Sequence, residues 1–207
     1  MSHTVDYFFA PQSPWTFMGH ERFARIARAT GATIKLKPMD LGGKVFPVSG
    51  GLPVSKRPPQ RQAYRMVELR RHSQFLGIAL NPQPRFFPVP ADDSARLVIA
   101  VDMHDGTEAA MKIAGALMAA VWAQERNVAD ADVLAQLLAE SGLDARRLAQ
   151  AGEPAVQARY DLNTKEAIDA GVFGAPSYVV DGEIFWGQDR LDFLERKLQS
   201  QEPQQPT

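Results

Sequence analysis

Residues 4–38 read TVDYFFAPQSPWTFMGHERFARIARATGATIKLKP. The β-prone run 4–9 ends at a Pro-containing turn, and apolar residues then recur at helical spacing from Ser13 to Gly31. Ser13 followed by Pro14 is typical of a helix N-cap with proline at the first helical position. The end of the stretch alternates apolar and charged residues, as a second strand does. The pattern predicts a β-α-β unit with parallel strands and a right-handed crossover.

The middle of the chain is predicted to be almost wholly helical. Residues 40–59 are rich in Gly and Pro, and a loop of that length is more often functional than a simple connector. Helical periodicity follows over about 60–76, 94–104, 107–125, 130–141, 144–151 and 154–170, with a Pro-rich break at 81–90. Asp130, Asp144 and Ser94 are candidate N-caps for three of these helices.

The C-terminal part returns to strands. Residues 177–180 and 183–186 flank Asp181-Gly182, a dipeptide typical of a two-residue hairpin turn, and a helix is predicted over 189–198. The element order predicts an α/β, thioredoxin-like fold with a large all-α insertion. We therefore expect a discontinuous thioredoxin-like domain, a helical insertion domain and a disordered tail, with bounds 1–39 plus 160–198, 40–159 and 199–207.

Composition excludes several classes of function. The 207 residues include 23 Lys and Arg against 24 Asp and Glu, so no global positive field exists to hold nucleic acid. The absence of cysteine excludes disulfide scaffolds, Cys-ligated metals and a cysteine nucleophile. The four histidines are scattered, so a metal site is not expected. No apolar run approaches the ~20 residues of a membrane span, and the N-terminus lacks a signal-like pattern, so a cytoplasmic protein is expected.

Ser13 is the first candidate for chemistry, because helix N-termini stabilise anions. Unpaired amides and the helix dipole favour negative charge there, and a thiolate is such an anion. The Ser13 hydroxyl can also donate a hydrogen bond to a ligand's sulfur and lower the pKa of that thiol. The simpler interpretation is a helix cap with no further role. Since the chain has no cysteine, any thiol used here must arrive with a ligand.

Two C-terminal segments are further candidates. In Gly174-Ala175-Pro176-Ser177 a proline stands directly before a strand. A cis Ala175–Pro176 bond would turn the Ala175 backbone toward an extended, peptide-like ligand, whereas a trans turn proline is the commoner case. Residues 186–190, Trp-Gly-Gln-Asp-Arg, join the hairpin to the last helix. Asp189 there either caps that helix or pairs with the charged end of a ligand.

Positive charge is concentrated between residues 54 and 74. Six cations stand against Glu68 alone, a balance suited to carboxylate ligands: Lys56, Arg57, Arg61, Arg65, Arg70 and Arg71. Lys56 and Arg57 lie in the Gly/Pro loop and are the stronger candidates, whereas Arg70 and Arg71 fit a solvated helix face. Three aromatic residues are candidates to line a pocket for a planar substrate, with core packing as the alternative: Trp15, Phe46 and Phe87.

Four separated motifs, in this order, resemble the 2-hydroxychromene-2-carboxylate isomerases. They are Asp6-Tyr7-Phe8-Phe9 with Ser13-Pro14-Trp15, Lys56-Arg57-Pro58-Pro59, the run from Gly171 to Ser177, and the run from Phe185 to Arg190. That family stands with the kappa-class glutathione transferases in the DsbA-like branch of the thioredoxin superfamily. The resemblance extends over nearly the whole chain.

The resemblance implies a glutathione-dependent cis-trans isomerase of naphthalene-type aromatic degradation, which converts 2-hydroxychromene-2-carboxylate into trans-o-hydroxybenzylidenepyruvate. Ser13 matches the family's catalytic serine, which activates the glutathione sulfur. Ala175, before a cis Pro176, matches the backbone that binds the cysteinyl part of glutathione. Lys56 and Arg57 match the loop that meets the substrate. The segment that holds the γ-glutamyl end is matched by Trp186, Gly187, Gln188 and Asp189. Relatives are commonly homodimers.

Two other functions stay open at this point. A kappa-like transferase or peroxidase would consume glutathione, whereas an isomerase returns it. A non-catalytic thioredoxin-fold binder or chaperone would have no glutathione affinity at neutral pH, and Ser13→Ala would not change its binding. Disulfide oxidoreductase activity is excluded, because the chain contains no cysteine.

Overall fold

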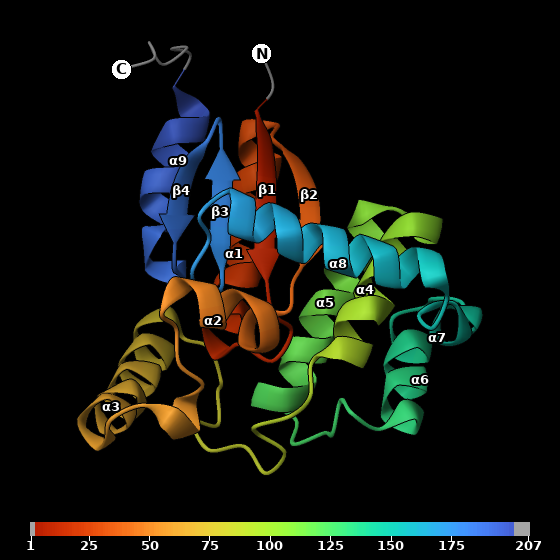
Figure 1. The fold of residues 1–207 in the computed structure, drawn as a ribbon, viewed down its shortest axis with the longest axis horizontal. Coiled ribbons are helices and arrows are strands. Elements are labelled where there is room, and N and C mark those ends of the chain that lie inside the picture. Colours follow the sequence, from red (N-terminus) through yellow and green to blue (C-terminus); the bar gives the residue numbers. More distant parts are fainter. Residues whose placement is uncertain (1–2, 201–207) are drawn as a thin grey trace.

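A four-stranded mixed sheet, built from the two ends of the chain, positions everything else (Figure 1). The computed structural model describes residues 3–200. Its strands are β1 (Thr4–Phe9), β2 (Thr33–Pro38), β3 (Ser177–Val180) and β4 (Glu183–Trp186), in the order β2-β1-β3-β4. β1 pairs in parallel with β2 and antiparallel with β3, and β3 pairs antiparallel with β4. The predicted α/β architecture is confirmed.

Helices cover both faces of this sheet and make up most of the chain between β2 and β3. They are α1 (Pro14–Thr30), α2 (Phe46–Ser49), α3 (Pro59–Leu76), α4 (Asp92–Asp105), α5 (Thr107–Trp122), α6 (Ala131–Glu140), α7 (Arg146–Gln150), α8 (Pro154–Asp169) and α9 (Leu191–Gln199). The Gly/Pro-rich stretch is more structured than a plain loop, since it contains a π-helical turn over Leu41–Val45, the short α2, and a 3-10 turn over Val54–Lys56. The Asp40 side chain starts the first of these turns by accepting a hydrogen bond from the Gly43 amide at 2.7 Å.

The two faces of the sheet bury different clusters. Alternate residues of β1 point to opposite sides. Tyr7 stacks between Phe9 and Tyr178, with ring centroids 4.6 and 5.2 Å away, in the larger core that includes α1 and α5. Phe8 faces the other side and packs in a smaller cluster with Ala167 of α8. Figure 1 shows α8 crossing one face of the sheet, with α1 on the other.

The local signals at both ends of the chain are confirmed. The Ser13 side chain caps α1, and Gly31 ends that helix in the left-handed conformation at φ 68°. Asp181 and Gly182 both have positive φ, 51° and 82°, which is the geometry that the two-residue hairpin turn requires. Helix α1 is therefore fixed at each end, and its first turn is held at the end of β1.

Several element boundaries differ from the prediction. Helix α7 begins at Arg146 with Ala145 at its N-cap position, so Asp144 as an N-cap is wrong. Ala91 already has helical backbone angles, so α4 begins at Asp92, and Ser94 lies in its first turn, where its hydroxyl donates to the Ala91 carbonyl at 2.8 Å. Ser94 as an N-cap is therefore wrong. Asp189 lies in a 3-10 turn (Gln188–Arg190) that precedes α9, whose N-cap position has no side-chain hydrogen bond, so Asp189 as its cap is also wrong. Helix α5 ends at Trp122 rather than at residue 125.

The division of the chain into a thioredoxin-like domain and a helical insertion stays a prediction. The expected boundary at residues 159 and 160 falls inside α8, which begins at Pro154. The expected disordered tail lies, from residue 201 onward, outside the described residues. Within residues 3–200, no helix is long and apolar enough to cross a membrane.

Candidate active site

Ser13 lies where the chain leaves β1 and enters α1. It is buried, with 8% of its surface exposed. Its Oγ accepts a hydrogen bond from the Thr16 amide at 3.2 Å and donates one to the Ala175 carbonyl at 3.4 Å. O–H···O bonds are usually near 2.7–2.8 Å, so the Ser13 hydroxyl is only weakly bound to Ala175. Ser13 is therefore a helix cap whose hydroxyl hydrogen is still available to a ligand.

Ala175 and Pro176 approach Ser13 from the opposite end of the chain. The bond between them is cis, so the trans geometry that the proline alone favoured is wrong and the cis geometry that the resemblance implied is confirmed. The Pro176 carbonyl accepts a hydrogen bond from the Gly187 amide at 2.9 Å. This bond ties the loop that faces Ser13 to the segment after β4. A second cis bond, Phe87–Pro88, was not predicted.

Trp186 is held in a fixed position while half of it stays exposed to solvent. Its ring packs edge-on against Phe173 with centroids 4.8 Å apart. Its Nε1 would lie 2.2 Å from a Cβ added at Gly174, so only glycine fits at that position. Trp186 is 50% exposed despite these contacts. An exposed, immobilised indole next to a proline loop is suited to holding the flat parts of a bound molecule.

Gln188 is buried, with 2% of its surface exposed, and both polar atoms of its side chain already have a partner. Its amide oxygen accepts from Arg22 at 2.8 Å, and its amide nitrogen lies 2.9 Å from Nδ1 of His72. His72 in turn lies 3.5 Å from a carboxylate oxygen of Glu68. This network joins α1, α3 and the turn before α9. Direct contact between Gln188 and a ligand stays a prediction.

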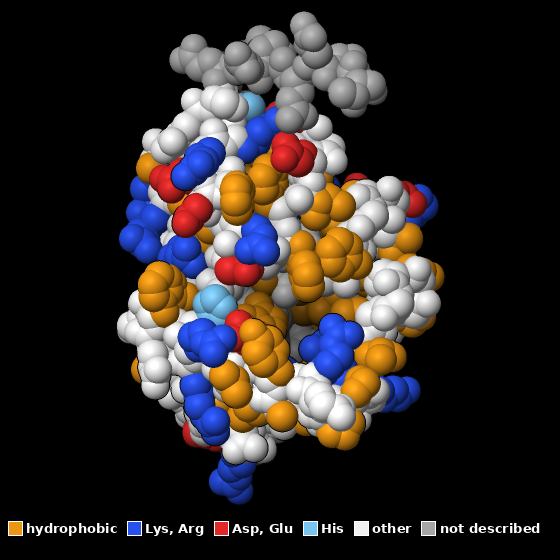
Figure 2. Space-filling view, turned by 90° about the vertical axis from the view of Figure 1, so that its left-hand side faces the viewer, with side chains coloured by type: hydrophobic (Ala, Val, Ile, Leu, Met, Phe, Trp, Pro, Cys, Tyr) orange, Lys and Arg blue, Asp and Glu red, His pale blue; other side chains and the backbone are white. Residues whose placement is uncertain are grey.

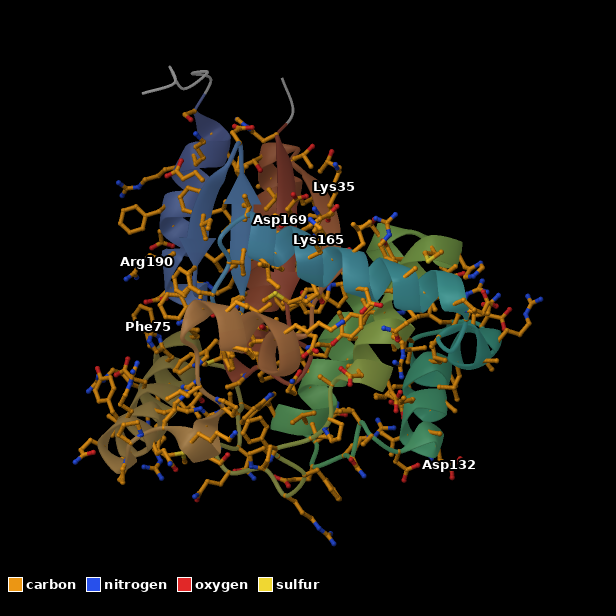
Figure 3. All side chains as sticks on the ribbon, viewed as in Figure 1. Lys35, Phe75, Asp132, Lys165, Asp169 and Arg190 are labelled. Atoms are coloured by element: carbon orange, nitrogen blue, oxygen red, sulfur yellow. The ribbon has the colours of Figure 1, made fainter. Side chains whose placement is uncertain are left out.

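Asp189 is on the surface beside this network. It pairs with Arg190 at 2.8 Å, and Figure 3 shows Arg190 on the outside of the molecule. The Asp189 carboxylate therefore remains accessible to a ligand.

Sequence reasoning missed Arg22 and His72, because their partner Gln188 is 166 and 116 residues away in the chain.

The structure does not bring all the predicted basic and aromatic residues together. Lys56 is exposed, while Arg57 is half-buried and donates through Nε to the Leu52 carbonyl at 2.8 Å. Burial, together with the neighbouring charge of Arg61, lowers the pKa of Arg57. Phe46 covers Gly51, where an added Cβ would lie 2.1 Å from the ring.

Two of the aromatic candidates pack on different helices. Trp15 lies edge-on to His72 of α3 with centroids 5.8 Å apart, whereas Phe87 packs on Trp122 of α5 at 4.9 Å. In the part of the chain that the structure describes, no ring contact joins Trp15, Phe46 and Phe87 to one another. Figure 2 shows a hollow on one face of the molecule, with hydrophobic side chains and Lys or Arg groups around it.

Comparisons with known proteins give matches over nearly the whole chain. The DSBA-like thioredoxin domain family matches residues 4–199. The chain is 30% identical, over 199 residues, to a 2-hydroxychromene-2-carboxylate isomerase of Sphingobium xenophagum, and the match covers 96% of this chain and 99% of that protein. It is 23% identical to glutathione S-transferase kappa 1 of Homo sapiens, with 96% and 92% covered. A solved structure of a 2-hydroxychromene-2-carboxylate isomerase matches with a TM-score of 0.73 and 28% identity, covering 94% of each chain.

Proposed function

Because the chain belongs to the DSBA-like thioredoxin domain family and, within it, to the 2-hydroxychromene-2-carboxylate isomerases, we propose that it isomerises 2-hydroxychromene-2-carboxylate with the help of glutathione. The protein is an isomerase enzyme. We propose in addition which thiol and which substrate this isomerase uses, and which residues bind them. Its product would be trans-o-hydroxybenzylidenepyruvate.

One observation carries the proposal: the Ser13 hydroxyl stands at the N-terminus of α1, in a chain without cysteine, facing a peptide carbonyl across a long hydrogen bond. Redox enzymes of this fold need a protein thiol, which this chain cannot supply. A hydroxyl at a helix N-terminus can instead stabilise a thiolate that belongs to a ligand. The same hydroxyl keeps α1 capped through the Thr16 amide.

The residues present fit glutathione. The tripeptide has a thiol, peptide groups and a charged γ-glutamyl end. Ser13 is placed to serve the thiol, and the Ala175–Pro176 loop, whose Ala175 carbonyl already faces Ser13, is placed to serve the peptide groups. Trp186 and Asp189 offer an exposed indole and an accessible carboxylate near the same loop. When bound, glutathione supplies a sulfur that can add reversibly to a carbon–carbon double bond conjugated with a carbonyl.

The protein's own groups have three tasks in such a reaction. Ser13 and the first turn of α1 keep the sulfur ionised through a hydrogen bond and the helix dipole. Cations at the site stabilise the negative charge that develops on the carbonyl oxygen of the substrate while the former double bond is single and turns. Lys56 and Arg57, next to the start of α3, are the predicted sources of that positive charge. No protein group is consumed.

The test is an absorbance assay of purified protein with 2-hydroxychromene-2-carboxylate, with and without glutathione, combined with a count of free thiols. Because the protein has no cysteine, every thiol counted belongs to glutathione. We expect conversion to the trans product only with glutathione, and an unchanged thiol count. Loss of thiol in step with substrate would indicate a kappa-like transferase instead. Conversion without glutathione, or no conversion, would contradict the proposal.

The kappa-class alternative rests on the similarity to glutathione S-transferase kappa 1, which is lower than that to the isomerases. The homodimer and the cytoplasmic location expected from the sequence stay predictions.

A further inference from the structure

Arg65 is a buried cation with no anionic partner. It lies in the middle of α3 and has 8% of its surface exposed, and no other Lys or Arg within residues 3–200 is buried. Its Nη2 has no hydrogen-bond partner, and no Asp or Glu of the described chain forms an ion pair with it. A buried charge normally requires a paired, hydrogen-bonded counter-ion. Arg65 is therefore a buried, charged donor that is free to bind an anion.

The rings around Arg65 place it beside the candidate active site. Its guanidinium carbon lies 5.3 Å from the centroid of Phe87 and 5.7 Å from that of Trp122. The Trp122 Nε1 donates to the backbone carbonyl of Gln12 at 3.3 Å, and Gln12 directly precedes Ser13. One indole ring thus contacts both the arginine and the chain that enters α1. The Gln12 side-chain oxygen is also buried and unpaired.

His72 gives a second link between α3 and α1. His72 follows Arg65 by seven positions, a spacing that puts both on one face of a helix. His72 contacts Trp15 in the first turn of α1. The face of α3 that carries Arg65 therefore faces the N-terminal turn of α1 and not open solvent.

The positive charge at this place is not neutralised locally. Burial, and after it the charge of Arg57, lowers the pKa of Arg65 to about 10, which leaves the guanidinium charged at neutral pH. The repulsion between the charges of Arg57 and Arg65 raises the electrostatic free energy of the folded protein. A cation–π contact with Phe87 and Trp122 offsets part of that cost but supplies no hydrogen-bond acceptor. A planar aromatic carboxylate would supply an anion, and its ring would pack on Phe87, which is only partly buried.

We propose that Arg65 is the carboxylate anchor of the aromatic substrate, binding that group through its guanidinium beside the contacting rings of Phe87 and Trp122. The inference rests on the proposed function for the identity of the substrate. It assigns to Arg65 the role of orienting the substrate beside Ser13. Lys56 and Arg57 keep their predicted role at the substrate's carbonyl oxygen, and the exposed Lys56 also attracts the anion from solvent. The side-chain oxygen of Gln12 is an unpaired, buried acceptor in the residue before Ser13, and it matches a substrate that also carries a hydroxyl group.

The test compares two ligands and three variants, without glutathione, by calorimetric titration. The ligands are 2-hydroxycinnamate and its uncharged amide, and the variants are Arg65→Met, Arg65→Lys and, as control, Arg70→Met. Arg70 lies on the same helix but is exposed. We expect the Kd of Arg65→Met for the carboxylate to rise roughly 10- to 100-fold, the range for a hydrogen-bonded charged group. The Kd for the amide should change less than about twofold, and Arg70→Met should match the wild type.

Each other outcome has a definite meaning. An unchanged carboxylate Kd in Arg65→Met, an equal loss for both ligands, or no carboxylate binding by the wild type would overturn the inference. If circular dichroism shows that Arg65→Met does not fold, Arg65→Lys decides. Lysine keeps the charge but lacks the planar guanidinium that can bind a carboxylate through two N–H groups, so we expect a weaker carboxylate affinity. An unchanged affinity would overturn the inference. Because glutathione is absent, carboxylate binding through Arg65 can hold even if the isomerase assay fails.

Discussion

The Ser13 hydroxyl and the Ala175 carbonyl, 162 residues apart in the chain, face each other across 3.4 Å. The pairing of β1 with β3 brings them together, because Phe8 lies opposite Ser177 in antiparallel register. The residues that follow β1 and those that precede β3 therefore meet at one end of the sheet. The N-terminal turn of α1 is added there by the Ser13 cap. The sheet thus places a hydroxyl, a helix N-terminus and a proline loop at one point.

Replacing Ser13 tests its two roles separately. Ser13→Ala removes the hydroxyl and the cap acceptor and should lower the free energy of unfolding by about 1 kcal/mol. Ser13→Gly also removes the hydroxyl but costs the cap only a few tenths of a kcal/mol. We expect both variants to raise the pKa of bound glutathione, measured by thiolate absorbance during a pH titration. If all three proteins hold the same thiolate fraction, Ser13 is a cap and nothing more.

Gly174→Ala tests whether the position of Trp186 matters for binding. The new Cβ would lie 2.2 Å from the indole Nε1, so the ring must move. Overpacking of this kind costs about 1–3 kcal/mol. We expect weaker glutathione binding in a calorimetric titration and a shifted Trp fluorescence maximum. Gly42→Ala is the matched control, since a Cβ there has nothing within 4 Å. Wild-type affinity in Gly174→Ala would remove Trp186 from the binding site.

The parts of the fold that could be predicted are those that local chemistry fixes. The Ser13 cap, the left-handed Gly31 and the Asp181-Gly182 turn each satisfy a need of the adjacent backbone, so a short stretch of sequence is enough to reveal them. Ser94 shows the limit of such signals. It has the right residue type for a cap, but the chain already turns helical at Ala91.

The parts of the site that could not be predicted depend on distant partners. Gln188 lies in a segment whose composition suggests ligand contact, yet its amide is occupied by Arg22 and His72 from two other helices. Arg65 stands in a stretch of basic residues that would fit a solvent-exposed helix face. Only the structure shows that it is buried, with its guanidinium over the ring of Trp122. Neither burial nor the absence of a counter-ion can be inferred from the residues next to it in the chain.

Lys56→Ala should act on substrate capture and not on glutathione. Lys56 is exposed and forms no ion pair among the residues that the structure describes, so its field is screened by salt. We expect the KM for 2-hydroxychromene-2-carboxylate to rise about two- to fivefold at low ionic strength, corresponding to less than about 1 kcal/mol. The increase should shrink in 0.5 M salt, where the Debye length is only about 4 Å, compared with about 30 Å at 0.01 M.

Lys35→Ala is the control for that measurement, because Lys35 is exposed on β2, away from α3 (Figure 3). It should leave the KM unchanged at either salt concentration. A change confined to glutathione affinity in Lys56→Ala would reverse the assignment of the loop.

The buried His20 should make the stability of the protein depend on pH. Its Nε2 lies 2.9 Å from the Met111 carbonyl, which can only accept, so Nε2 carries the hydrogen and Nδ1 accepts from the Tyr7 hydroxyl at 3.1 Å. Burial lowers the pKa of His20 below the ordinary 6.5. At a pH between the lowered pKa of folded His20 and 6.5, the unfolded chain binds a proton that the folded protein does not. The stabilising contribution of neutral His20 is therefore full above pH 6.5 and falls as the pH is lowered.

His20→Gln removes this titration and provides the measurement. In the wild type, the free energy of unfolding from urea titrations should fall with decreasing pH below 6.5, with a contribution from His20 of at most about 1.4 kcal/mol per pH unit. The variant should be less stable at pH 7.5 but show a flatter slope between pH 6.5 and 5. His104→Gln, which changes an exposed histidine, should keep the wild-type slope. Equal slopes in wild type and His20→Gln would mean that His20 takes up a proton in the folded protein as readily as in the unfolded chain, and the Tyr7 hydroxyl would then have to accept from the protonated Nδ1.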